Sequence, residues 1–391
     1  MPGFLAHGVA CGIKINHQKD LALILSEVAA SVAAVFTKNQ VPSPSVTFSK
    51  NVLKRAKTVR AIIVNSGNAN AITGDKGYAD CRIIVEQTAA ALGVNPREIL
   101  IASTGVIGVA LPIKKVLNEI PNLVAGLTAN GWKSASEAIL TTDLVSKTAQ
   151  TSTVLNGKKI TVGGIAKGSG MIHPNMATML GFITTDASIS SKVLKSALLE
   201  AIDPTFNAIT VDGESSTNDC VMALANGRAE NASLRRGSVD YKKFVMALTE
   251  VCRVLSWKIV KDGEGATKFI TVRVFDAKTK TAARKVAVQV AKSTLVKTAM
   301  FGQDPNWGRI IAAMGNANVA LQQEKIEIRL DNVVLVKKGQ PVAVSKKKLL
   351  VIMKKKDIRI DLFLNQGNHQ AEVYTCDLSY DYVRINAEYT T

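Results

Sequence analysis

The part of this chain best suited to covalent chemistry is the loop-like sequence that runs from Gly163 to Thr178. Residues 179–185 follow it and predict a buried strand, so Thr178 stands where a loop meets a strand. A threonine hydroxyl becomes a nucleophile only when a base activates it. Threonine is also common beside strands because it favours β structure. Position alone therefore does not give Thr178 a catalytic role.

Lys167 stands among glycines in the same stretch, which suggests a phosphate-binding loop. The order Lys-Gly-Ser-Gly at 167–170 differs from the Gly-Lys-Ser/Thr of a P-loop, and no helix start follows it. Residues 163–170 also lack GxGxxG spacing, and the sequence at 171–174 breaks any helix that would receive a pyrophosphate. We predict no nucleotide site here, and interpret the glycines as allowing a tight backbone fold.

The histidines and cysteines predict neither a metal site nor a disulfide framework. The histidines lie far apart, without the spacing of metal ligands. The number of cysteines is odd and none forms a CxxC pair, so we expect reduced, partly buried thiols. These residues are His7, His17, His173 and His369, with Cys11, Cys81, Cys220, Cys252 and Cys376.

The formal charge of +18 raises the hypothesis of a nucleic-acid-binding protein. The lysines gather at 337–338, 346–348 and 354–356, beside apolar runs such as 349–353. No aromatic residues are interleaved there for base stacking. Lysines that flank strands blunt sheet edges and keep a surface soluble, which is the interpretation we prefer.

The length and the first residues indicate a globular protein that is not exported. A chain of 391 residues corresponds to two or three compact units at roughly 100–200 residues each. The first ten residues lack a basic region and a continuous apolar core, so no secretory signal is expected. No apolar run reaches the roughly 18 residues of a membrane span. We expect a cytoplasmic protein.

The pattern of the sequence around the candidate residues predicts a mixed α/β structure. Short strands at 61–64 and 99–102 each end in a small, polar, glycine-bearing loop, at 65–71 and 103–108, with a helix over about 78–92 between them. Residues 145–163 predict a hairpin around Asn156-Gly157. Later helices are expected at 191–201, 241–258 and 286–297, and strands at 270–274, 326–330, 333–336 and 358–364.

The run Lys167-Gly-Ser-Gly-Met-Ile-His-Pro-Asn-Met-Ala-Thr-Met-Leu180 resembles the self-cleavage signature of the ornithine acetyltransferase family. The resemblance spans essentially the whole chain, because further segments occur in the family's order. Before this run they lie at 8–14, 65–71, 103–108 and 141–143, and after it at 206–213, 216–219, 261–268 and 304–309.

The resemblance implies a chain that cuts itself between Ala177 and Thr178. The Thr178 hydroxyl would attack the Ala177 carbonyl, and water would release two chains. Thr178 would then carry a free α-amine, whose unperturbed pKa of roughly 7.7–8 suits a general base near neutral pH. A Ser/His/Asp triad is not needed for this chemistry.

The resemblance also implies the reaction and its binding residues. Thr178 would take the acetyl group from N-acetylornithine and pass it to glutamate in a ping-pong cycle, with Thr104 and Gly105 stabilising the oxyanion. Recognition of a carboxylate and an amine needs both a cation and an anion in the pocket. By the same resemblance, the substrate-binding residues are Thr141, Lys167, Thr178, Glu264, Asn386 and Thr391.

The family's fold is a layered αββα sandwich of the self-processing N-terminal-nucleophile type, with a smaller C-terminal α/β domain. We therefore expect chains 1–177 and 178–391, the second divided into a core part at 178–280 and the small domain at 281–391. The two chains would stay together as an α2β2 heterotetramer. No cofactor is expected, and the sequence leaves open whether acetyl-CoA is a second donor.

Two residue sets near these motifs receive no catalytic role. His173 lies close to the cut, but we interpret it as a tolerated loop side chain, which the processing rate of a His173→Ala variant would test. The segment 304–309 is distinctive, but its order alone does not say whether it lines the pocket or holds the fold, and we interpret it as structural or as support behind the site.

Two other functions remain as alternatives. A related self-cleaving aminopeptidase or amidase would pass the acyl group to water, so it would not depend on glutamate. A basic nucleic-acid-binding protein would bind RNA with a steep salt dependence and would not cut itself.

Overall fold

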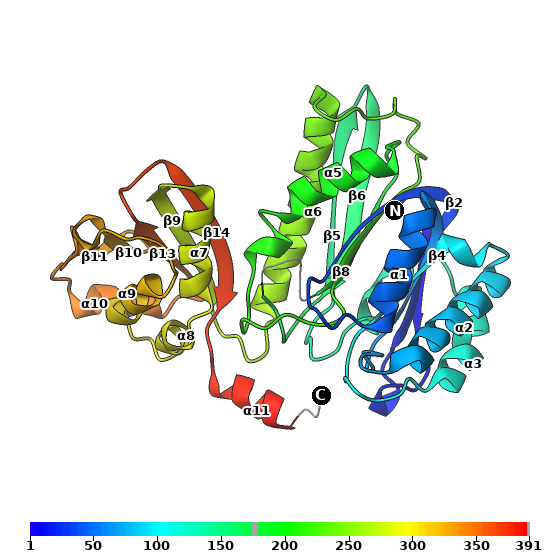
Figure 1. Cartoon of the computed structure of the whole chain (residues 1–391), viewed down its shortest axis with the longest axis horizontal. Coiled ribbons are helices and arrows are strands. Elements are labelled where there is room, and N and C mark those ends of the chain that lie inside the picture. The colour runs from blue at the N-terminus through cyan, green and yellow to red at the C-terminus, as the bar shows by residue number, and fades with distance from the viewer. Residues whose placement is uncertain (174–178, 389–391) are drawn as a thin grey trace.

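The computed structural model describes residues 1–173 and 179–388 (Figure 1). Within this part, the first body is built on an eight-stranded sheet in the order β4-β3-β2-β8-β7-β6-β5, with β1 paired to β2. Its strands are β1 (Phe4–Val9), β2 (Leu21–Phe36), β3 (Thr58–Asn65), β4 (Ile99–Ser103), β5 (Lys147–Leu155), β6 (Lys158–Lys167), β7 (Leu180–Thr185) and β8 (Cys220–Ala225).

The long strand β2 folds this sheet into two layers. Its first part, from Leu21 to Leu25, pairs with β3, and this pairing resumes at Ala30 and Ser31 after a register shift. From Ser31 to Phe36 the strand pairs with β8. Inward side chains of β2, β3 and β4 then form one buried core with those of β6, β7 and β8. Apolar burial of this kind is the dominant favourable contribution to folding.

Helices cover both outer faces of the folded sheet. Helices α5 (Ser191–Ile202) and α6 (Val239–Lys261) pack on the half that contains β8, β7 and β6. Helices α2 (Gly74–Leu92) and α3 (Ile113–Ala125) pack on the half that contains β3 and β4. The predicted αββα layering is therefore confirmed. The remaining helices of this body are α1 (Pro44–Arg55) and α4 (Trp132–Ala138), with the short 3-10 helices η1 (Ile15–His17), η2 (Pro96–Glu98) and η3 (Phe206–Ala208).

A smaller α/β body follows, in agreement with the predicted fold class. Its described strands form a sheet in the order β12-β11-β10-β13-β9-β14, with its own apolar core. The strands are β9 (Phe269–Ala277), β10 (Glu327–Leu330), β11 (Val333–Lys337), β12 (Gln340–Pro341), β13 (Asp357–Phe363) and β14 (His369–Cys376). The helices are α7 (Lys280–Ala291), α8 (Thr294–Phe301), α9 (Trp307–Gly315), η4 (Gln323–Lys325) and α10 (Lys346–Met353).

After β14 the chain leaves the small body and runs back below the first one as helix α11 (Tyr380–Glu388) (Figure 1). None of the described residues of α11 is buried. This return brings the last part of the sequence to the ends of β6 and α6, where the candidate residues lie.

Most predicted elements are present, and three predictions need correction. The hairpin turns at Asn156 and Gly157, which both have positive φ as a type I′ turn requires. Residues 163–167, predicted as loop, are the buried end of β6. The helix predicted over 286–297 is two helices, because Ser293 caps α8 by accepting a hydrogen bond from the Val296 N–H. The apolar run at 349–353 belongs to helix α10 and not to a strand.

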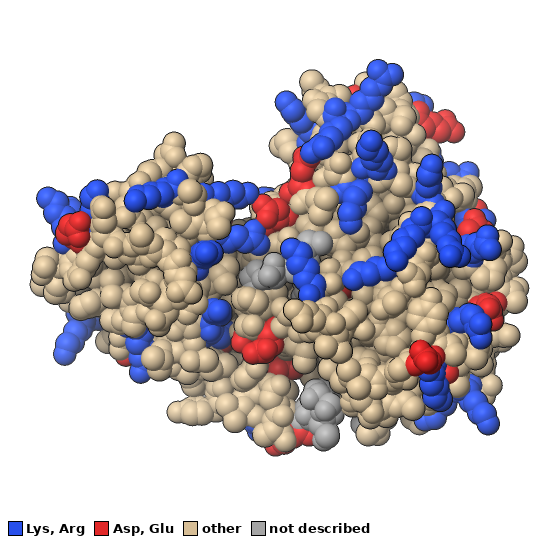
Figure 2. All heavy atoms as spheres, in the orientation of Figure 1, with Lys and Arg blue, Asp and Glu red and all other residues tan. Residues whose placement is uncertain are grey.

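Lys and Arg side chains are spread over both bodies on the face that Figure 2 shows. Among the described residues, no helix has the length and apolar character needed to cross a membrane.

Candidate active site

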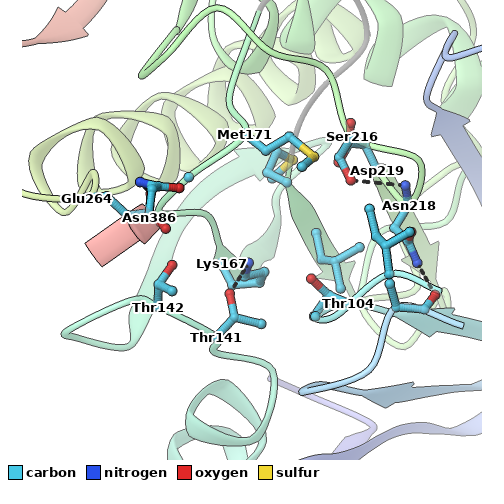
Figure 3. Close-up of a pocket in the computed structure, with 16 residues that line it drawn as sticks. Thr104, Thr141, Thr142, Lys167, Met171, Ser216, Asn218, Asp219, Glu264 and Asn386 are labelled. Atoms are coloured by element: carbon cyan, nitrogen blue, oxygen red, sulfur yellow. Dashed lines mark hydrogen bonds between the residues drawn. The ribbon is translucent and has the colours of Figure 1, made fainter. Parts of the chain in front are cut away.

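One pocket collects side chains from distant parts of the sequence (Figure 3). The ends of β4 and β6 meet the starts of β7 and β8 there, the loop after α6 adds Glu264, and α11 adds Asn386. The polar residues that line the pocket are Thr104, Thr141, Thr142, Lys167, Ser216, Asn218, Asp219, Glu264 and Asn386.

The structure brings together six residues that the sequence pointed to. They are Thr104, Gly105, Thr141, Lys167, Glu264 and Asn386, and all line this pocket. Ala177, Thr178 and Thr391 lie outside the described residues. Met171 and Met179, which stand on either side of the undescribed residues 174–178, also line the pocket.

The turn at Thr104 and Gly105 is held by close backbone packing. The Thr104 N–H donates to the Asn65 carbonyl at 3.0 Å. Gly105 has a φ of 131°, and a Cβ there would overlap the backbone of Gly67 and Asn68. Only glycine adopts this conformation and this close approach without strain. The two glycine-bearing loops of the first body are therefore locked against each other.

Asn218 ties these two loops to the strand that carries Asp219. Its side-chain Nδ2 donates to the Ala69 carbonyl at 2.6 Å and to the Ser103 carbonyl at 2.8 Å. Asn218 is buried, so both hydrogen bonds form away from bulk water. The residue thus fixes the turn at Thr104 relative to β8.

Lys167 is the cation of the pocket. Its Nζ donates to the Thr141 Oγ1 at 2.6 Å and lies 3.7 Å from the Asp143 Oδ2. Burial lowers the pKa of Lys167, and the Asp143 carboxylate opposes that shift. The ammonium is therefore held in place by a hydroxyl and a carboxylate on the loop after α4.

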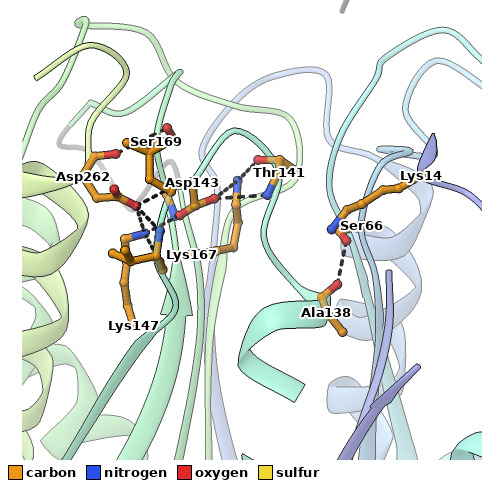
Figure 4. A network of polar contacts seen from close by, with 12 residues as sticks. Lys14, Ser66, Ala138, Thr141, Asp143, Lys147, Lys167, Ser169 and Asp262 are labelled. Atoms are coloured by element: carbon orange, nitrogen blue, oxygen red, sulfur yellow. Dashed lines mark hydrogen bonds and ion pairs between the residues drawn. The ribbon is translucent and has the colours of Figure 1, made fainter. Parts of the chain in front are cut away.

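A buried network of charges supports that loop from behind (Figure 4). The Lys147 Nζ lies between the Asp143 Oδ1, at 2.6 Å, and the Asp262 Oδ2, at 2.5 Å. Asp143 Oδ1 also accepts the Gly168 N–H at 2.8 Å, and Asp262 accepts the backbone N–H of Leu144 at 3.1 Å. Burial raises the pKa of Asp143, but the ammonium groups of Lys167 and Lys147 outweigh it and hold this pKa below its usual value.

Glu264 supplies a carboxylate on the α6 side of the pocket. A Cβ on Gly170 would overlap the Glu264 carboxylate, so the glycine makes room for it. Because Lys167 and Glu264 line the same pocket, the site can receive a ligand that carries both an anionic and a cationic group.

His173 and the segment 304–309 were given no catalytic role from the sequence. The His173 Nδ1 is 3.4 Å from the Thr210 Oγ1, and the ring is partly buried. The segment 304–309 does not contribute to the pocket lining within the described residues. It joins α9 to α8, because Asn306 caps α9 and Arg309 donates to the Leu295 carbonyl at 3.0 Å.

Four charged residues at or behind the pocket received no role from the sequence: Asp143, Lys147, Asp219 and Asp262. Asp143, Asp219 and Asp262 stand inside motifs that the resemblance covers, which was the available signal. Lys147 had a weaker signal. It lies near the start of the predicted hairpin, at a position where the alternation of side chains along a strand points inward. Its two carboxylate partners could not be read from spacing, because Asp262 is 115 residues away.

Comparison with known proteins identifies the family of this chain. Residues 5–391 match the ArgJ family. The chain is 46% identical over 389 residues to the arginine biosynthesis bifunctional protein ArgJ of a Bacillus cereus strain, and the match covers 100% of this chain and 95% of that protein. It is 44% identical over 398 residues to ArgJ 1 of a Nostoc species, with 100% and 96% covered.

The chain is also similar to a crystal structure of ArgJ from Bacillus halodurans, with 44% sequence identity and a TM-score of 0.53. The match covers 54% of this chain and 100% of the Bacillus halodurans chain. The family match covers nearly the whole sequence, and both relatives are more than 40% identical to the chain over at least 95% of their own length. The chain belongs to the ArgJ family.

Proposed function

We propose that this protein is a self-cleaving acetyltransferase of arginine biosynthesis that moves an acetyl group from N2-acetylornithine to glutamate. Membership of the ArgJ family supports the pathway. The observation that carries the chemistry is the shared pocket, in which the Thr104–Gly105 turn, the Lys167 cation and the Glu264 anion lie between the two ends of the proposed cleavage segment.

Self-cleavage would begin with attack of the Thr178 hydroxyl on the Ala177 carbonyl. The C–N bond breaks, an ester joins the two parts, and water hydrolyses the ester. The second chain then starts at Thr178 with a free amine, which can accept the hydroxyl proton in later turnovers. Met171 and Met179 both line the pocket, so processing and transfer can use the same oxyanion donors.

Transfer would follow in two half-reactions. The Thr178 hydroxyl attacks the acetyl carbonyl of N2-acetylornithine, ornithine leaves, and an acetyl ester remains. Glutamate then enters the same pocket, and its amine takes the acetyl group. Thr104 and Gly105 are the proposed donors to the oxyanion, because they end β4 at the pocket wall.

Both substrates contain an α-carboxylate, and each has a second charged group at the end of its side chain. Lys167 is the proposed partner of a substrate carboxylate. Glu264, with Asn386 beside it, is the proposed partner of a substrate amine. Thr141 and Thr391 complete the proposed binding set, and no resident cofactor is part of it.

The two chains are proposed to remain together and to assemble as an α2β2 heterotetramer in the cytoplasm. The sheet order supports their association. Strands β7 and β8 of the second chain lie between β2 and β6 of the first, so two strand pairings join the chains.

An intact-mass spectrum with and without N2-acetylornithine tests the proposal. We expect two chains divided at Ala177/Thr178 and one added acetyl group on the second chain. A Thr178→Ala variant should stay as a single unmodified chain. A wild-type chain that is never cut and never acetylated would overturn the proposal.

Two further measurements distinguish a transferase from an amidase and test acetyl-CoA as a second donor. Loss of the acetyl group only when glutamate is added indicates a transferase, whereas loss to water at the same rate indicates an amidase. Incubation with acetyl-CoA in place of N2-acetylornithine tests the second donor, since acetylation of the second chain would make the enzyme bifunctional.

A further inference from the structure

Asp219 is a buried carboxyl group of the pocket that the mechanism above does not use. It is 3% exposed and stands directly before β8. The backbone there is fixed, because the Asp219 carbonyl accepts the Thr37 N–H at 2.9 Å and the next N–H, of Cys220, donates to the Met179 carbonyl at 3.1 Å. The side chain is therefore held at the pocket wall beside the start of β7.

The Asp219 Oδ2 is buried without a hydrogen-bond partner among the described residues. A buried polar atom without a partner is energetically unfavourable, and more so if it is charged. Among the described contacts Asp219 makes no ion pair with Lys167, whose ammonium is held by Asp143 and Thr141. Because Asp219 lines the pocket, its side chain lies beside any group that binds there.

Asp143 and Asp219 are carboxyl groups under the influence of the same lysine, but their environments differ. Two ammonium groups hold the pKa of Asp143 down. Burial raises the pKa of Asp219 well above its usual value, and Lys167 only partly opposes this shift. Titratable pairs whose environments separate their pKa values commonly divide acid and base roles. The environment of Asp143 thus favours its charged form, and that of Asp219 favours its protonated form.

The proposed reaction needs such a proton. The amide nitrogen of N2-acetylornithine carries one hydrogen, whereas ornithine leaves as an ammonium ion with three, since aliphatic amines are largely protonated at neutral pH. The Thr178 hydroxyl supplies one of the two missing protons. In the second half-reaction, glutamate enters as an ammonium ion and must give up two protons. One of them restores the hydroxyl, and the other needs an acceptor.

We propose that Asp219 stores this second proton between the two half-reactions. In the first, the Asp219 carboxylic acid gives its proton to the leaving amine of ornithine and becomes a carboxylate. In the second, that carboxylate takes one proton from the ammonium group of glutamate, which frees the amine lone pair for attack on the acetyl ester. Each cycle returns Asp219 to the acid form, so no proton is exchanged with water. This inference rests on the proposed function.

The charged and titratable groups around Asp219 fit this role. Lys167 on β6 favours the carboxylate that forms in the acetylated enzyme. The Cys220 thiol on β8 is buried, and burial raises its pKa so far that it stays neutral. Glu264 faces the same pocket from the end of α6 and also acts on Lys167. Lys167 favours the ionised form of Asp219 most among its neighbours, and hydrogen bonds from Ser216 and Met179 add to this effect.

An Asp219→Asn variant tests the proposal, because asparagine keeps the shape and cannot take up a proton. The variant is acetylated with N2-acetylornithine, and the ester is then mixed with glutamate or with hydroxylamine, an amine that is unprotonated at neutral pH. We expect transfer to glutamate to slow about 100-fold at pH 7 and to recover about tenfold per pH unit as the free amine of glutamate increases. Transfer to hydroxylamine should match the wild type.

Equal slowing with both acceptors, or no slowing with either, would overturn the role of Asp219. The matched control is Asp186→Asn. Asp186 is also buried with a raised pKa caused by burial, but it accepts the Thr161 N–H at 2.7 Å and does not line the pocket. This control should react with both acceptors at the wild-type rate.

A second measurement needs no variant and remains informative if Asp219→Asn does not fold or cut itself. Wild-type enzyme is mixed with N2-acetylornithine in weak buffer containing a pH indicator. We expect an acetylation burst without net proton uptake, and uptake of one proton per acetyl group would refute an internal store. Failure to form any acetyl ester would instead contradict the proposed function itself.

Discussion

The Asn386 side chain donates a hydrogen bond to the Glu264 carboxylate, with 2.7 Å between Nδ2 and Oε2. This contact joins α11, which has no buried residue among those described, to the end of α6. The position of the pocket carboxylate thus depends on the C-terminal helix.

We predict that Asn386→Ala raises KM for both substrates about tenfold and changes kcat little, because hydrogen bonds to charged groups are worth about 1.5–3 kcal/mol. Steady-state kinetics checks this. The control is Arg384→Ala on the same helix, whose partner Asp381 is also exposed and whose loss should leave KM unchanged. A lower kcat with unchanged KM would contradict the binding role of Asn386.

A tag fused after Thr391 should weaken substrate binding more than a tag fused before Met1. Helix α11 delivers Asn386 to the pocket, and Thr391 follows Asn386 by only five residues. KM for N2-acetylornithine, measured for the two fusion proteins, provides the test. Equal values would speak against a binding role of Thr391.

Lys147→Met should lower the free energy of unfolding by about 3–5 kcal/mol, because it leaves two buried carboxylates without their cation. Lys147 and Asp143 are fully buried, and Asp262 nearly so. Lys19→Met is the control, since Lys19 and Glu137 form a pair that is more than one-third exposed and such pairs contribute about 0–1 kcal/mol. Urea unfolding of both variants measures the difference, and equal losses would refute a special role for the buried network.

Gly105→Ala should reduce kcat about 100- to 1,000-fold, the usual effect of losing one oxyanion donor. The added Cβ would push the turn away from the backbone of Gly67 and Asn68. Gly315→Ala is the matched control, because a Cβ at Gly315 meets no atom within 4 Å. If single-turnover acetylation by Gly105→Ala proceeds at the control rate, the turn does not stabilise the oxyanion.

His173 should make folding sensitive to acid. Burial, aided by Lys292, lowers the pKa of His173 to about 4, from an ordinary value of 6.5. Between these values the unfolded chain binds more protons, so stability falls as the pH drops from about 6.5 to 4. His173→Gln should lose stability less steeply over this window than the wild type, while the exposed His369→Gln should not differ from it. Parallel pH profiles for wild type and His173→Gln would contradict this prediction.

Most of the predicted elements came from local patterns, and the site residues came from resemblance. The hairpin at 145–163 was predicted because its turn residues are diagnostic, and β3 and β4 were predicted because apolar runs end in glycine-bearing loops. The long strand β2 and strand β8 were not predicted. Strand β8 is buried along its whole length and shows no alternation, so its apolar run does not distinguish a strand from a helix.

The contacts of the site that the sequence did not predict join residues that are far apart along the chain. Lys147 and Asp262 meet only after α6 packs on β5, and Asn218 reaches Ser103 across 115 residues. The missing partner of the Asp219 Oδ2, among the residues that the structure describes, is likewise a property of the assembled pocket. Lys147, Asp219 and Asp262 received no role from the sequence, because the partners of a side chain, and the lack of one, are fixed only in the folded chain.

The position of β7 and β8 between β2 and β6 has a consequence for the order of the unfolding reaction. Before a cut after Ala177, unfolding is a one-molecule event, and Tm does not depend on protein concentration. After the cut, the same sheet can unfold only by releasing two separate polypeptides, so refolding becomes a second-order reaction and Tm rises with concentration by mass action. Cleavage of the single bond between Ala177 and Thr178 would thus change the thermodynamic behaviour of this fold from that of a monomer to that of a complex.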